Sequence, residues 1–270
     1  MWRWLQALRG RIAEPGYGHG LGKPIPDALW RATLRRYPFL LDQRAQDEAR
    51  LRGLCMQFLG EKEFHGASGL NISDEIALAI AAQACLPVLR LGLAWYDDFV
   101  GIVVHPGEVL ASREVTDEAG VIHRYKEALA GEAMHQGPVM LSWQDVQQAG
   151  QDAERPYNVV IHEFAHKLDL RDGAPDGCPP LPANFMGAKS AKQARQAWLA
   201  VLQAEYEAFR ERTTIAERFS GAPTWLDPYA ASAIDEFFAV ACEAYFVDRK
   251  RFAAEHPSLL PLFDAFFKAA

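Results

Sequence analysis

The segment from Asn158 to Asp169, NVVIHEFAHKLD, constrains the fold of this chain more than any other. Two imidazoles four residues apart lie nearly one above the other on an α-helix, which has about 3.6 residues per turn. His162 and His166 can therefore reach one metal ion, while Glu163 projects to a neighbouring side of that ion. The segment predicts a zinc site on a helix, with Glu163 placed to take a proton from water.

The residues around this motif predict a buried helix near 157 to 170. Apolar side chains lead into the motif and continue through it, and Gly173 follows a charged end as a stop signal. Two His and a Glu inside such a helix would be costly if unpaired. The alternative to a metal site is that these groups are polar core residues satisfied by hydrogen bonds, or a partly exposed polar stripe.

Two His need a third protein ligand, and the first candidate is Asp172, ten residues after His162. That spacing is the metzincin register, which requires a sharp turn, usually at Gly, where this chain has Asp169. We expect Asp169 to continue the helix instead. It then either orients the His166 imidazole as a hydrogen-bond acceptor or is a solvated charge in the last turn.

The second candidate lies in the nearly apolar segment 235–246, where Glu236, Val240 and Glu243 fall on one helical stripe. Acids are favoured in the first turn of any helix, and Ser232 could cap this one, so Glu236 has an alternative explanation. Glu243 lies deeper in the segment, so a position in the first helical turn cannot explain it. We predict Glu236 as the third ligand and Glu243 as a residue that holds a ligand from behind, or as the ligand itself if Glu236 only starts the helix.

A third His is the last candidate. His105 and His135 stand near the ends of probable strands or loops, and the other histidines lie in polar surroundings where a surface position is expected. These are His19, His65, His123 and His256.

Several blocks of the chain resemble the Mlc titration factor A family, zinc peptidases of the gluzincin type. The blocks are CLPVLRLGLAW at 85–95, QGPVMLSW at 136–143, the segment 158–169, and YAAS at 229–232 followed by EFFAV at 236–240. The resemblance implies that His162, His166 and Glu236 bind one zinc ion, that Glu163 is the general base and that Tyr229 belongs to the active site. In such a site the Tyr229 hydroxyl can hydrogen-bond the oxyanion.

The same resemblance implies a cytoplasmic bacterial peptidase of aminopeptidase type. The best-known member of the family binds the repressor Mlc and so influences sugar uptake, which makes a peptide substrate and a Mlc-like repressor the expected partners. Two other functions stay open: a regulatory binding protein with a non-catalytic zinc site, and a zinc hydrolase of non-peptide substrates.

Composition agrees with an enzyme built on one substantial core. The 270 residues are 50% hydrophobic, and the net charge of −7 argues against nucleic acid as a direct partner. No apolar run is long enough for a membrane span. The four Cys show no paired metal-type spacing, and Cys85 and Cys242 lie in apolar helical segments, which favours a reducing compartment.

Organisation along the chain predicts an α+β zincin-like domain, mostly helical with a small mixed sheet. Residues 1–26 read as a tail and Gly/Pro-rich linker, and 27–270 as a single catalytic domain whose part 27–95 is helical and whose part 96–270 holds the sheet and the site helices. Helices are expected at 27–36, 43–59, 74–93 and 188–212, the third opened by Ser73. Strands are expected at 99–105 and 137–143. Either could edge the cleft and hold an extended peptide, or both could be core strands.

Overall fold

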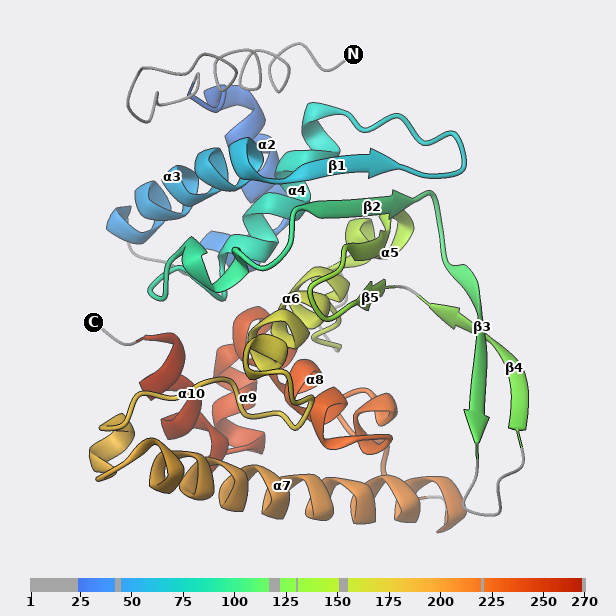
Figure 1. Cartoon of the computed structure of the whole chain (residues 1–270), viewed down its shortest axis with the longest axis vertical. Helices are drawn as coiled ribbons and strands as arrows, with labels where there is room; N and C mark the ends of the chain where they lie inside the picture. The colour runs from blue at the N-terminus through green and yellow to red at the C-terminus, as the bar shows by residue number, and fades with distance from the viewer. Residues whose placement is uncertain are drawn as a thin grey trace.

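The computed structural model describes residues 24–41, 45–116, 122–129, 131–150, 155–219 and 221–268 (Figure 1). Its α-helices are α2 (Asp27–Arg36), α3 (Ala45–Glu61), α4 (Asp74–Cys85), α5 (Trp143–Gln148), α6 (Val159–Asp169), α7 (Ala191–Phe219), α8 (Ile234–Val247), α9 (Arg249–Glu255) and α10 (Leu259–Phe267). Its strands are β1 (Glu63–Gly66), β2 (Gly101–His105), β3 (Val109–Thr116), β4 (Ile122–Leu129), β5 (Gly131–Ala133) and β6 (Val139–Ser142). The predicted class, α+β with helices predominating and a small mixed sheet, is confirmed.

The main sheet has the strand order β1-β2-β6-β5. β1, β2 and β6 run parallel, with Ile102 of β2 opposite Val139 of β6, and β5 pairs antiparallel with β6. Both strands predicted from the sequence therefore exist, as β2 and β6. They are interior strands, the second of the two alternatives, and the edges of the described sheet are β1 and β5.

The N-terminal helical part follows local sequence signals closely. Ser73 caps α4 as expected, because its hydroxyl accepts a hydrogen bond from the backbone N–H of Ile76 at 3.2 Å. α4 ends at Cys85 rather than near residue 93. Pro87 has no N–H to continue the helical ladder, so the chain passes through turns to Gly92.

Two helices at the centre of the molecule carry the residues singled out by the sequence. α6 and α8 cross beneath the sheet, with α4 on one side of them and the long helix α7 on the other (Figure 1). One hydrophobic cluster runs from Ile25 to Phe267 and takes in buried residues of 27–95 and of the remainder alike. α6 and α8 are therefore held rigidly against each other by the core.

Two further features differ from expectation. A second, two-stranded sheet pairs β3 with β4 antiparallel, and in the view of Figure 1 this hairpin extends along one side of the molecule toward the end of α7. α7 itself ends at Phe219, seven residues beyond the predicted helix end. Among the described residues, no helix is long and apolar enough to cross a membrane.

Candidate metal centre

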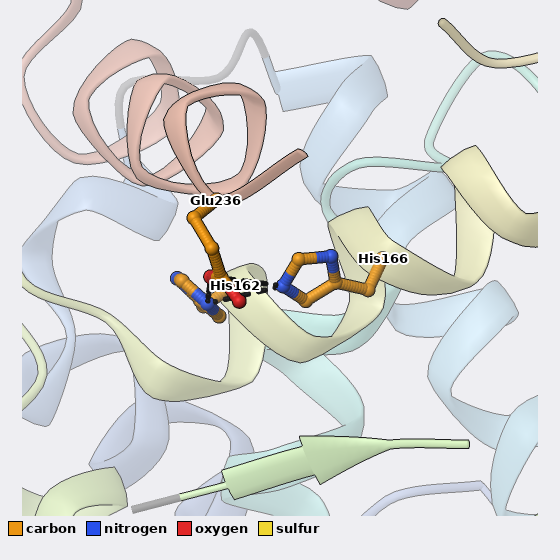
Figure 2. Close-up of side chains that lie close together, drawn as sticks. All are labelled: His162, His166 and Glu236. Atoms are coloured by element: carbon orange, nitrogen blue, oxygen red, sulfur yellow. Dashed lines mark hydrogen bonds and ion pairs between the residues drawn. The ribbon is translucent and has the colours of Figure 1, made fainter. Parts of the chain in front are cut away.

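Three side chains from α6 and α8 converge on one point (Figure 2). α6 begins at an Asn158 cap, whose side chain accepts from the N–H of Ile161 at 2.9 Å, and this start places His162 and His166 on the face toward α8. Glu236 comes from the first turn of α8. Its Oε2 lies 3.0 Å from Nε2 of His162 and 3.3 Å from Nε2 of His166, and the two Nε2 atoms are 3.2 Å apart.

Glu243 lies behind His162. Its Oε1 is 2.8 Å from Nδ1 of His162, and its Oε2 accepts the backbone N–H of Asn158, the residue that caps α6. A carboxylate in this position favours the tautomer with the proton on Nδ1, so that the lone pair of Nε2 faces His166 and Glu236. The predicted stripe on α8 is thus present, with Glu236 in front of the imidazoles and Glu243 behind one of them.

The donor set fits a tetrahedral metal ion. Donors about 2.0–2.1 Å from one tetrahedral ion lie about 3.3–3.4 Å apart, close to the separations of 3.0, 3.2 and 3.3 Å seen here. Two imidazole nitrogens and a carboxylate oxygen that face one another are poorly satisfied by hydrogen bonds alone. Each hydrogen bond between two of these atoms needs a proton on one of them, and two atoms that both lack a proton repel each other. A cation satisfies all three, so His162, His166 and Glu236 could hold a metal.

The electrostatics of the triad also favour a cation. Burial lowers the pKa of His162, but hydrogen bonds to Glu236 and Glu243 outweigh it and raise that pKa well above its usual value. Burial raises the pKa of Glu236, yet its hydrogen bonds to His162 and His166 lower it far below the usual range. The carboxylates that would hold a proton on an imidazole can hold a metal ion in its place.

Glu163 is buried beside the triad and lines the same cavity of about 420 Å³. Burial raises its pKa to about 7, although the nearby His162 and His166 lower it. A carboxyl group with that pKa can both accept and return a proton near neutral pH. Its space is provided by Gly131 of β5, where an added Cβ would lie 2.4 Å from Oε1 of Glu163.

Tyr229 stands at the rim of this cavity, with 46% of its surface exposed. Its hydroxyl donates to Oε1 of Glu236 at 3.0 Å, so the phenol reaches the triad from outside. Ser232, which the sequence offered as a possible cap of α8, does not cap that helix. Its hydroxyl donates to the carbonyl of Tyr229 at 2.7 Å, and the cap position of α8 is Ala233.

The other residues that the sequence analysis considered lie away from the triad. Asp169 is fully buried, so a solvated charge is wrong, and its Oδ2 accepts from the N–H of Gly177 at 2.9 Å. Within the described part of the chain no hydrogen bond joins Asp169 to His166, and its orienting role stays a prediction. Asp172 is exposed and pairs with Arg195 at 3.7 Å. His256, expected at the surface, is buried and pairs with Glu205 at 3.1 Å.

Sequence reasoning missed strand β5. Gly131, Glu132 and Ala133 all line the cavity opposite α6. A signal existed, since an isolated Gly in a strand often marks a close backbone approach, but three residues are too few to show strand periodicity. Lys167 holds this region in place: its buried ammonium donates to the carbonyls of Met134 and Gly137 at 2.5 and 2.8 Å, in the turn between β5 and β6.

Comparison with known proteins agrees with this geometry. Residues 19–268 match the family described as glucose-regulated metallo-peptidase M90. Mlc titration factor A of Salmonella arizonae is 31% identical to the chain over 243 residues, which cover 90% of this chain and 91% of that protein. The protein of the same name from Salmonella gallinarum is 31% identical over 232 residues, which cover 86% of this chain and 82% of the relative.

Proposed function

The chain belongs to the glucose-regulated metallo-peptidase M90 family, and we propose that it is a zinc-dependent peptidase. The observation that carries the proposal is that one cavity gathers three converging donors and the buried carboxyl group of Glu163. His162, His166 and Glu236 would hold the zinc ion, one per chain, and Glu243 would keep His162 in the ligating tautomer. When bound, zinc supplies a Lewis acid that lowers the pKa of a water molecule towards about 7.

The residues of the chain then have distinct tasks in hydrolysis. Glu163 takes a proton from the water that attacks the peptide carbonyl carbon, and returns it to the amine as the C–N bond breaks. Its raised pKa, about 7, suits both transfers. The Tyr229 hydroxyl, 3.0 Å from Glu236, is placed to turn toward the carbonyl oxygen as that oxygen gains negative charge.

A peptide is the favoured substrate because an edge strand borders the cavity. β5 is an edge strand of the described sheet, and its three residues line the cavity. An extended peptide can add to such an edge through backbone hydrogen bonds, which would lay its carbonyl groups across the site. The strand edge thus favours peptides over the small compact substrates of other zinc hydrolases.

The charges around the site support the aminopeptidase type. Besides the residues already assigned, Glu132, Asp227 and Asp235 line the cavity, and the described part of the lining includes no Lys or Arg. Such a surface attracts the ammonium group of a free peptide N-terminus. Amino-terminal cleavage therefore belongs to the proposal. We also propose that Asp169, buried in the last turn of α6, helps to orient the His166 imidazole.

A regulatory role is proposed beside catalysis, because the curated relatives are named as titration factors of Mlc. A Mlc-like repressor would then be a protein partner, and the chain would influence sugar uptake through it. We also propose a cytoplasmic location, supported by the four cysteines, all of which are buried and free of disulfides. Residues 27–270 would act as one catalytic domain behind the N-terminal tail.

The test is hydrolysis of a peptide panel by zinc-loaded protein and by its Glu163→Gln variant. The panel pairs each free N-terminus with its acetylated form and includes internally quenched peptides. We expect cleavage of free N-termini by the wild type and a loss of at least about 100-fold in the variant, as is typical for a general base. Zinc content, measured in both, should be equal, since Glu163 is not a ligand.

Other results would redirect the assignment. Equal cleavage of acetylated peptides would replace the aminopeptidase type by an endopeptidase. Zinc binding without cleavage of any peptide would contradict the peptidase and leave the regulatory binding role. A variant as active as the wild type would remove Glu163 from the mechanism.

A further inference from the structure

The cavity that holds the metal triad has an apolar wall beside His166 that the proposed chemistry does not use. Leu170 follows His166 by four residues, so it lies one turn further along the same side of α6. Its backbone still has helical angles, and its N–H donates to the His166 carbonyl. The Leu170 side chain therefore lines the cavity next to a metal-binding residue.

Leu170 differs from the other branched aliphatic residues of this lining. Val159 and Val240 are 3% and 4% exposed and belong to the hydrophobic core. Leu170 is only half-buried, and it is not among the described residues that form this core or pack against it. Its apolar surface is thus free to be covered by whatever the cavity binds.

Pro175 adds a second apolar group to the same cavity. After α6 the chain turns, with the Gly173 N–H donating to the Leu170 carbonyl at 2.9 Å. Gly173 has a φ of 88° at this turn, a left-handed conformation that favours glycine. The loop beyond it places Pro175 in the cavity lining together with Leu170. Neither side chain offers a hydrogen-bonding group, so this part of the wall suits an apolar ligand group.

Buried hydrogen bonds hold the loop that carries Pro175. The backbone N–H of Gly177 donates to Oδ2 of Asp169 at 2.9 Å, and the Gly177 carbonyl accepts the indole N–H of Trp198 at 2.7 Å. Asp169 and Trp198 are both fully buried. The wall is therefore formed before a ligand arrives, and binding does not have to order it.

We propose that Leu170 and Pro175 form a subsite that selects substrates with a bulky apolar side chain, such as Leu, beside the bond that is cleaved. The inference rests on the proposed peptidase function for the nature of the ligand. Because Leu170 lies one helical turn from His166, the side chain that it contacts belongs to a residue close to the metal. A hydrophobic pocket of this kind discriminates between side chains by their size.

Peptide binding tests the subsite without any need for turnover. The full-length protein is zinc-loaded and carries Glu163→Gln so that peptides stay intact. The ligands are tetra-alanine peptides with a C-terminal fluorophore, in which Leu replaces Ala at each position in turn. Dissociation constants are measured by fluorescence anisotropy. The same peptides are also offered to zinc-loaded protein that keeps Glu163, and their cleavage is measured.

We expect Leu at one position to bind at least about tenfold more tightly than Ala, because added methylene groups in a hydrophobic pocket have effects of this size. Leu170→Ala should reduce this advantage to less than about threefold, since most of the apolar surface that the ligand covers is then lost. Leu170→Trp should abolish it, because the larger side chain fills the space that the ligand occupies.

Leu199→Ala is the matched control. Leu199 is a half-buried leucine of α7 outside the cavity lining, and its variant should retain the whole advantage. Zinc content and urea unfolding, measured for every variant, show that it is folded. If Leu170→Ala does not fold, Leu170→Trp decides the test alone.

The outcomes separate the possible errors. No advantage for Leu at any position, including an absence of measurable binding, overturns the subsite. An advantage that survives the Leu170 variants, or that is lost equally in Leu199→Ala, overturns it as well. A protein that cleaves none of the peptides but still shows the Leu170-dependent advantage would contradict the peptidase function and leave the subsite standing.

Discussion

Replacement of Gly131 by Ala is the sharpest test of how β5 and Glu163 fit together. The added Cβ would lie 2.4 Å from Oε1, 2.6 Å from Cγ and 2.7 Å from Cδ of Glu163, whereas ordinary contact begins at 3.4 Å. The Glu163 side chain must therefore retreat by about 1 Å. A displacement of about 1 Å in an active site costs about 100-fold in rate, or about 2.7 kcal/mol of barrier.

The same change should barely affect stability. The atoms that must move belong to the end of a flexible side chain rather than to the backbone, and Ala restricts the unfolded chain more than Gly does. We expect the free energy of unfolding to change by less than about 1 kcal/mol. Bound zinc should be unchanged, because the three atoms nearest to the added Cβ all belong to Glu163, which is not one of the three donors.

The assay is kcat/KM on the best peptide of the panel, together with zinc content and urea unfolding. Gly60→Ala is the matched control, since Gly60 lies in α3 with open space around the added Cβ. A Gly131→Ala enzyme within threefold of the wild-type kcat/KM would refute the argument that β5 sets the position of Glu163. A loss of zinc along with activity would refute it differently, by showing that the triad rather than Glu163 had moved.

Two further predictions concern stability. Lys167→Met should lower the free energy of unfolding by about 2–4 kcal/mol, because the carbonyls of Met134 and Gly137 would lose their buried donor; a change below about 0.5 kcal/mol in urea unfolding would contradict it. Glu205→Gln should destabilise the protein only where Glu205 is ionised, because hydrogen bonding to His256 lowers the pKa of Glu205 below its ordinary value of 4.5. A carboxyl group whose pKa is lower in the folded state stabilises the protein at pH values above its pKa in the unfolded state. This stabilisation is lost as the pH falls through its pKa in the folded state. The free energy of unfolding of wild type and variant, measured with urea between pH 7 and 3, should therefore differ less below about pH 4.5. A difference that grows as the pH falls would contradict this argument.

Local patterns explain why much of the site could be predicted. The spacing of His162 and His166 is a property of one helix, and so is the stripe of Glu236, Val240 and Glu243. Each pattern needs only the helical repeat and the cost of burying polar groups. The cap signal at Ser73 is equally local, and the structure places its hydroxyl as a hydrogen-bond acceptor at the start of α4.

Errors and open alternatives arose where the answer depended on contacts between distant segments. The order of strands, which places β2 and β6 inside the described sheet and β1 and β5 at its edges, depends on pairing across the chain. His256 looks like a surface residue until α7 brings Glu205 against it, and Asp169 looks like a solvated end of a helix until Gly177 folds back onto it. The end of α4 is a different case, because Pro87 was visible in the sequence and its effect on the helix could have been anticipated.

By itself, the sequence determined which side chains can act, because helical periodicity and burial cost depend on neighbours a few residues away. It named the two imidazoles, the carboxylate between them and the two acids of the partner helix. Only the tertiary structure decided which acid faces the imidazoles and which stands behind, since that choice depends on how α6 and α8 pack. It alone also placed Gly131 against Glu163, because this contact joins two segments that no local pattern relates.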